Sequence, residues 1–94
     1  MGRRLVERRL RDLGGKLRSL RASLEIVEEQ LAHLSDEAED MGLRALVSET
    51  PGADLEYREA RRHADAMLRH RDSVREAIAE LEARQDQLLE QIRP

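Results

Sequence analysis

The feature that most constrains this chain is a seam of apolar residues that recur at alternating steps of four and three. In the first half of the chain the pattern continues without a miss from Val6 to Ala45. Its members are Val6, Leu10, Leu13, Leu17, Leu20, Leu24, Val27, Leu31, Leu34, Ala38, Met41 and Ala45. Such a narrow apolar stripe is typical of a coiled-coil helix, because the core-facing side of a globular helix is wider.

A second seam with the same spacing occupies the other half of the chain. Its members are Ala53, Tyr57, Ala60, Ala64, Met67, Arg71, Val74, Ile78, Leu81, Gln85, Leu88 and Ile92. Only Arg71 and Gln85 interrupt the apolar pattern, and we interpret both as residues that penalise slipped registers, with Arg71 reaching toward Glu28.

Turn-forming residues cluster between the two seams, at positions 48–52. Pro51 cannot continue a helix hydrogen-bond ladder, and Thr50 is expected to cap a second helix that has Pro51 as its first residue. The sequence therefore predicts an all-α fold, an antiparallel two-helix coiled-coil hairpin formed by the single domain 1–94. We expect the first helix at about 4–47 and the second at about 53–93.

Two registers satisfy both seams. If the numbers of paired seam residues sum to 98, Val6 lies opposite Ile92. In this register the charged residues beside the seam also face each other, Lys16 with Arg84 and Arg21 with Arg75. If they sum to 105, the basic segment 1–13 becomes largely a mobile arm, with residues 1–12 beyond the paired region. We favour the sum of 98 because it buries Val6 and Leu10.

Composition excludes several classes of protein. With no Phe, no Trp, one Tyr and 39% charged residues, the chain has too few bulky side chains for a sandwich, a barrel or an α/β core. The absence of Cys excludes disulfides and thiol chemistry. No apolar run approaches a membrane span and no segment has the form of a secretory signal, so we expect a cytoplasmic protein without membrane contact.

Residues that could carry catalysis or bind a metal are sparse. His63 and His70 are seven residues apart, about 10 Å along a helix, which is too far to chelate one ion, and His33 occupies an outward position. Neither a glycine-rich phosphate loop nor a nucleophile with its base is suggested by the spacing. We therefore expect no enzyme activity, catalytic residue, metal, cofactor or small-molecule substrate.

Charge is distributed unevenly along the chain. Residues 1–21 hold eight basic against two acidic residues, residues 22–60 hold two against eleven, and residues 61–94 balance seven against seven. The first segment suggests phosphate binding as an alternative function, although the chain lacks aromatic residues for base stacking. The candidate phosphate-binding residues are Arg3, Arg4, Arg8, Arg9 and Arg11.

Eight Leu, Ile and Val residues lie outside the seams. They are Leu5, Ile26, Leu43, Leu46, Val47, Leu55, Leu68 and Leu89. Four of them flank the turn and form, with nearby acids, our candidate partner-binding site: Leu43, Leu46, Val47, Leu55, Asp40, Glu49, Asp54 and Glu56. An isolated two-helix hairpin offsets chain entropy poorly. We therefore predict a non-enzymatic protein-interaction or regulatory module that forms a homo-oligomer, such as a four-helix bundle, or docks on a protein partner through its acidic turn.

Two resemblances accompany these patterns. The stretch from Glu49 to Leu88, with its run E-Y-R-E-A-R-R-H-A-D-A-M at Glu56 to Met67, resembles small uncharacterised coiled-coil hairpin proteins of high-GC bacteria. Asp54, Leu55, Tyr57, Ala60 and the segment 78–82 are similar to the second helix of the coiled-coil hairpin in Gre-type transcription factors, although Leu55 and Tyr57 are closer together here. That second resemblance implies an RNA polymerase-binding transcription modulator whose acidic turn enters the secondary channel.

Overall fold

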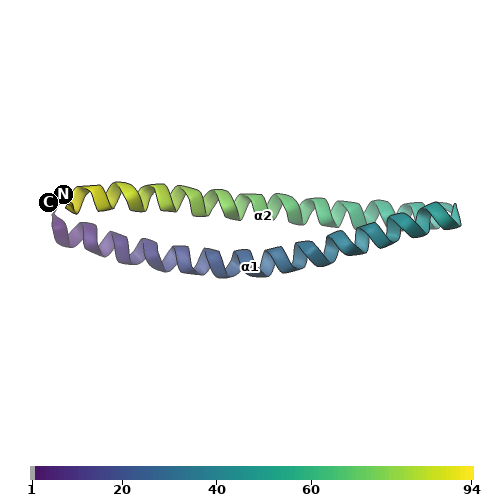
Figure 1. Cartoon of the computed structure of the whole chain (residues 1–94), viewed down its shortest axis with the longest axis horizontal. Coiled ribbons are helices and arrows are strands. Elements are labelled where there is room, and N and C mark those ends of the chain that lie inside the picture. The colour runs from purple at the N-terminus through teal and green to yellow at the C-terminus, as the bar shows by residue number, and fades with distance from the viewer. Residues whose placement is uncertain (1) are drawn as a thin grey trace. The chain divides into compact units, whose positions relative to one another are not determined.

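A computed structural model of the chain describes residues Gly2–Pro94. Two helices account for nearly all of them, α1 (Arg3–Ser48) and α2 (Pro51–Ile92), and the described residues include no strand (Figure 1). The fold is the all-α helical hairpin that the two seams predict. The connection is shorter than the expected turn at 48–52, because Ser48 still belongs to α1 and Pro51 already begins α2.

The end of α1 depends on a left-handed backbone conformation at Glu49. This residue has a φ of 51°, which is uncommon for a residue other than glycine. Its N–H donates to the carbonyl of Ala45 at 3.1 Å, and the Ser48 hydroxyl donates to the carbonyl of Arg44 at 2.7 Å. The bond to Ala45 satisfies one of the four carbonyls that the end of a helix otherwise leaves without partners.

The start of α2 has the predicted cap. The Thr50 hydroxyl accepts a hydrogen bond from the Ala53 N–H at 3.2 Å, and the Thr50 carbonyl accepts the first helical bond from the Asp54 N–H at 3.1 Å. Pro51 is the first residue of the helix, where its missing N–H leaves no bond unmade. The prediction for Thr50 and Pro51 is confirmed.

The hairpin divides into two compact units. Unit 1 combines the part of α1 up to Leu24 with Ser73–Pro94, and unit 2 is the continuous segment Glu25–Asp72, which contains the turn. Every seam position predicted in either unit is buried or half-buried, which confirms the seam. Even Arg71 and Gln85, the two polar members, are half-buried.

Unit 1 contains the hydrophobic core cluster. Its buried members are Val6, Leu13, Leu17, Val74, Ile78 and Leu88, and Leu10, Leu20, Leu24, Leu81 and Ile92 pack against them half-buried. Val6 and Leu17 are each only 1% exposed. Burial of Val6 agrees with the register in which paired residue numbers sum to 98, and not with the register that leaves residues 1–12 as a free arm.

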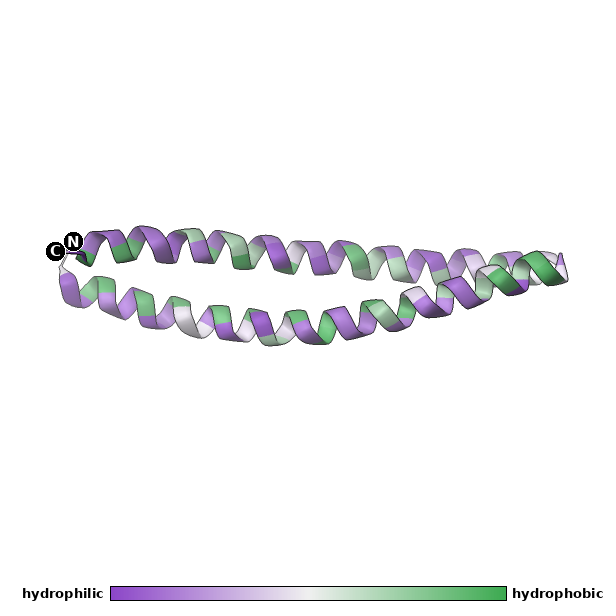
Figure 2. Ribbon diagram, viewed as in Figure 1, coloured by the Kyte–Doolittle hydropathy of each residue, from purple (hydrophilic) through white to green (hydrophobic). Residues whose placement is uncertain are grey.

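Unit 2 buries much smaller side chains. Its buried residues are Val27 and three alanines, Ala38, Ala45 and Ala64. Six of its large apolar residues are exposed: Ile26, Leu43, Leu46, Val47, Leu55 and Leu68. In Figure 2 the green of apolar residues is prominent on α1 close to the turn. Unit 2 therefore leaves more large apolar side chains in water than it buries.

Candidate protein-interaction surface

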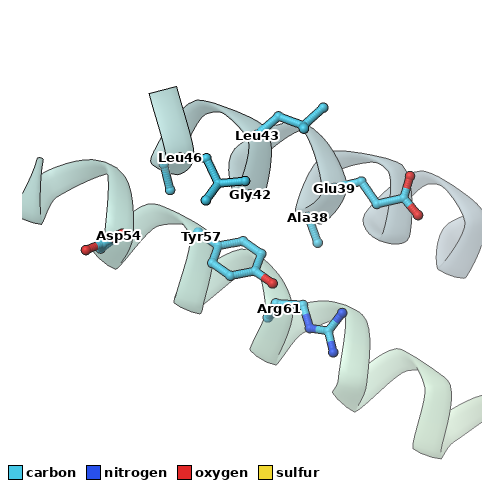
Figure 3. Close-up of a pocket in the computed structure, with 9 residues that line it drawn as sticks. Ala38, Glu39, Gly42, Leu43, Leu46, Asp54, Tyr57 and Arg61 are labelled. Carbon is cyan, nitrogen blue, oxygen red and sulfur yellow. The ribbon is translucent and has the colours of Figure 1, made fainter. Parts of the chain in front are cut away.

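The only tyrosine of the chain determines how the two helices pack near the turn. Tyr57 is a seam residue of α2, and its ring lies against the backbone of α1 at Gly42 (Figure 3). A Cβ atom added to Gly42 would lie 3.1 Å from Tyr57 Cε1 and 3.4 Å from Cδ1, closer than ordinary van der Waals contact. The absence of a side chain at Gly42 therefore makes room for the ring.

An open groove of about 540 Å³ surrounds this contact. Its lining residues are Ala38, Glu39, Gly42, Leu43, Ala45, Leu46, Asp54, Tyr57 and Arg61. In Figure 3, Leu46 and Tyr57 approach the groove from opposite helices, whereas Leu43 points away from α2. The charged side chains at its edge are Glu39, Asp54 and Arg61.

A second groove, of about 520 Å³, lies beside the turn. Its lining residues are Leu43, Arg44, Val47, Ser48, Ala53 and Glu56. Leu43 lines both grooves, so the apolar residues of α1 near the turn form one neighbourhood. Leu43, Leu46 and Val47 are 64%, 76% and 86% exposed, and we call these three residues the turn-end surface.

The structure brings together some of the predicted partner-binding residues and separates others. Asp54 lines the first groove and Glu56 the second, so both are near the turn-end surface. Leu55 is 50% exposed on α2 but lines neither groove. Asp40 and Glu49 are exposed and also line neither of them.

Three further residues of this surface were not singled out from the sequence. They are Glu39, Gly42 and Arg61, which line the first groove. The one available signal was a glycine inside a long helical pattern, since such a residue often marks a close packing contact. Neither the ring that covers Gly42 nor the groove beside it follows from heptad spacing alone.

The candidate phosphate-binding arginines lie on α1 in unit 1, and all five are exposed. Arg3 Nε is 3.1 Å from Glu7 Oε1, one turn further along the helix. Arg9 lines a groove of about 300 Å³ together with Lys16 and Arg84. Lys16 and Arg84, predicted to face each other, thus border one cavity from opposite helices.

Arg21, one member of the two predicted like-charge pairs, has a carboxylate partner on the other helix. Its Nη2 lies 3.0 Å from Glu82 Oε2 and forms an ion pair between the helices. The arginine side chain is long enough to reach a carboxylate of α2 that does not lie directly opposite it in the heptad register. The seam residue Arg71 has its Nε 2.9 Å from Asp72 Oδ1, within the same helix.

The described part of the chain has neither a metal-binding cluster nor a membrane-spanning stretch. From Gly2 to Pro94, no group of three or more His, Asp or Glu side chains is arranged to hold a metal ion, and all three histidines are exposed. Neither α1 nor α2, as described, has a stretch that is both long and apolar enough to cross a membrane. Among known proteins, the chain matches no family model, no curated protein and no solved structure.

Proposed function

We propose that this protein is a non-enzymatic protein-interaction module that docks on a protein partner through the turn-end surface. The observation that carries the proposal is the exposure of Leu43, Leu46 and Val47 beside two grooves. Apolar surface in contact with water is unfavourable by about 25 cal/mol per Å². Contiguous exposed apolar patches on soluble proteins mark interaction sites for this reason.

The groups around the turn-end surface indicate the chemistry of the partner. Interfaces commonly combine buried apolar anchors with a polar rim that remains near water. Here the anchors are Leu46 and Val47. The rim has three carboxylates and two guanidinium groups, from Glu39, Asp54, Glu56, Arg44 and Arg61. A partner with an apolar pocket bordered by basic residues fits this surface, because opposite charges steer association and select the partner.

The composition of unit 2 gives docking an energetic role. Its buried side chains are mainly alanines, and each alanine removes little apolar area from water. A partner that covers Leu46 and Val47 would supply area that the two helices do not supply to each other. Docking would thereby stabilise unit 2 through the linkage between binding and folding.

The test compares proteins captured by three immobilised forms of the full chain from a lysate of its native cells. They are the wild type, Leu46→Ser/Val47→Ser, and the control Leu5→Ser/Leu89→Ser, whose residues are 37% and 38% exposed in unit 1. We expect one protein to be captured by the wild type and by the control. The amount captured by the turn-end variant should be about tenfold lower, because the loss of a buried anchor weakens binding by that order. Polymerase subunits in that position would support the Gre-like function.

Circular dichroism of the same three proteins separates docking from folding. All should have the same helix content, because none of the substituted residues lies in a seam. Identical captured proteins for all three forms would contradict the proposal. Loss of helix in the turn-end variant alone would also contradict it, by making Leu46 and Val47 part of the fold.

A second candidate function is sequence-independent phosphate binding by the basic segment. It is favoured by the exposure of all five arginines on one helix of unit 1. Retardation of duplex DNA at low salt, steeply weakened by added salt, is the expected behaviour, since bound arginines release counterions. Arg3→Ala/Arg4→Ala/Arg8→Ala/Arg9→Ala should abolish it, whereas alanines at Arg58, Arg61, Arg62 and Arg69 of unit 2 should not. Equal retardation by both quadruple variants would refute this function.

A further inference from the structure

The two units carry opposite net charges. Unit 1 contains eleven Arg and Lys against seven Asp and Glu, a net charge of +4, and unit 2 contains six against thirteen, a net charge of −7. The apolar residues divide in the same way, since unit 1 holds the core cluster and unit 2 holds most of the exposed apolar side chains. Unit 1 is therefore net positive, whereas unit 2 is net negative and carries most of the exposed large apolar side chains.

Unit 1 has a basic groove with an apolar floor. Arg9, Lys16 and Arg84 line the groove of about 300 Å³, whose other lining residues are Asp12, Leu13, Leu81 and Leu88. A neighbouring groove of about 420 Å³ shares Arg9, Arg84 and Leu88 and adds Glu80, Ala83, Gln87 and Gln91. Lys16 and Arg84 have no ion-pair partner among the described residues. A carboxylate between them would relieve the repulsion of two like charges held on facing helices.

Unit 2 presents a complementary surface. Leu43 lines both of its grooves, with Glu39, Asp54 and Arg61 in the first and Glu56 and Arg44 in the second. Unit 2 as a whole has a net charge of −7. Both glutamates are exposed and lie outside the seams, so they can pair with cations without unpacking the helices. Apolar side chains between carboxylates match an apolar floor between cations in both polarity and charge.

We propose that the partner of the turn-end surface is a second copy of this chain, whose unit 1 receives that surface in its basic groove. A two-fold axis repeats the contact, so that unit 1 of each copy lies on unit 2 of the other. This inference rests on the proposed function, because it names the occupant of the same surface. Contact between two turn-end surfaces would instead bring together the glutamates beside them, Glu39 and Glu56 of each copy. A nucleic acid would leave the apolar floor of the groove without an apolar counterpart.

The contact predicts a specific result when two charge-reversed variants are mixed. Lys16→Glu/Arg84→Glu makes the groove acidic, and Glu39→Arg/Glu56→Arg makes the rim around the turn-end surface basic. Each variant alone places like charges at both contacts of its homodimer. In a mixed dimer, the acidic groove of one variant meets the basic turn-end surface of the other, and the second contact is wild type.

Sedimentation equilibrium at physiological salt, over a range of protein concentrations, measures the association. We expect the wild type to form a dimer of the 10.8 kDa chain, each variant to dissociate at least about tenfold more readily, and the equimolar mixture to regain wild-type association. Circular dichroism checks that both variants remain helical. Variants that associate as tightly alone as in the mixture would overturn the inference.

The remaining outcomes separate this inference from the proposed function. A wild type that stays monomeric, with capture of another protein dependent on Leu46 and Val47, overturns the second copy and leaves the proposed function standing. A Leu46→Ser/Val47→Ser variant that dimerises and captures proteins as the wild type does refutes both. A monomer whose DNA retardation is lost in Lys16→Glu/Arg84→Glu assigns the groove to phosphates and overturns the inference.

Discussion

The ring of Tyr57 packs on α1 at Gly42 so closely that a methyl group on this glycine would lie 3.1 Å from Cε1. Glycine inside a helix is unfavourable by about 1 kcal/mol relative to alanine. At Gly42 this loss of helix propensity accompanies close packing of the only aromatic side chain of the hairpin. Local helix preference and packing between helices thus favour different residues at one position.

Alanine substitutions at two glycines separate these effects. At Gly14 an added Cβ would have Arg18 Nη1 as its nearest neighbour, at 3.6 Å, so Gly14→Ala should stabilise the protein by about 1 kcal/mol. Gly42→Ala should be less stable than Gly14→Ala by about 1 kcal/mol, because the ring has to move. Urea unfolding followed by circular dichroism measures both. If Tyr57→Leu does not remove the difference, the ring is not its cause.

Two valines, Val6 inside the core and Val47 outside it, test the register in which paired seam residues sum to 98. Val6 is 1% exposed in unit 1, so Val6→Ala should reduce the free energy of unfolding by about 1.5 to 2 kcal/mol. Val47 is 86% exposed, so Val47→Ala should change it by less than about 0.5 kcal/mol. Chemical denaturation of a dilute sample measures both changes. Equal, small effects would favour the register that leaves Val6 on a free arm.

The cap of α2 gives a third prediction. Thr50→Ala removes the oxygen that accepts the Ala53 N–H, and should lower the free energy of unfolding by about 1 kcal/mol. Thr50→Ser keeps that oxygen and serves as the control, with a change of a few tenths of a kcal/mol. Thermal unfolding should rank the wild type and Thr50→Ser together, above Thr50→Ala. A reversed order would show that the hydroxyl has no capping role.

The left-handed backbone conformation at Glu49 gives a fourth prediction. Glu49→Gly should stabilise the hairpin by about 0.5 to 1 kcal/mol, because glycine adopts a φ of 51° without steric cost. Glu49→Ala removes the same carboxylate without that freedom, and should not stabilise. Comparison of the two in urea separates backbone strain from charge. Equal stabilisation by both would attribute the gain to the lost carboxylate.

The ion pair between Arg21 and Glu82 should contribute little to stability. Both side chains are 51% exposed, and exposed ion pairs contribute about 0 to 1 kcal/mol. A double-mutant cycle with Arg21→Ala and Glu82→Ala should give a coupling energy below about 1 kcal/mol, which falls as salt is raised. A coupling energy that is larger and independent of salt would mean that the pair is shielded from water.

Patterns between near neighbours allowed much of this fold to be predicted. The spacing from Val6 to Ala45 defines the buried face of α1, because heptad repeats place every seam residue on one side of a helix. Thr50 and Pro51 specify the start of α2 through bonds to the next few residues. Leu46 and Val47 could be predicted as exposed, since they lie outside the seam of a two-helix structure.

Contacts between the helices decided what the seams left open. Val6 and Ala38 are both buried seam residues of α1, yet Val6 belongs to a cluster of large side chains in unit 1, whereas Ala38 is one of the alanines buried in unit 2. The contact of Gly42 with Tyr57, the grooves beside it and the pairing of Arg21 with Glu82 depend on side-chain sizes and reach across two helices. Amino-acid sequence determined which faces meet, because helical periodicity is local. Tertiary structure decided which side chains fill the space between them, because packing depends on both helices at once.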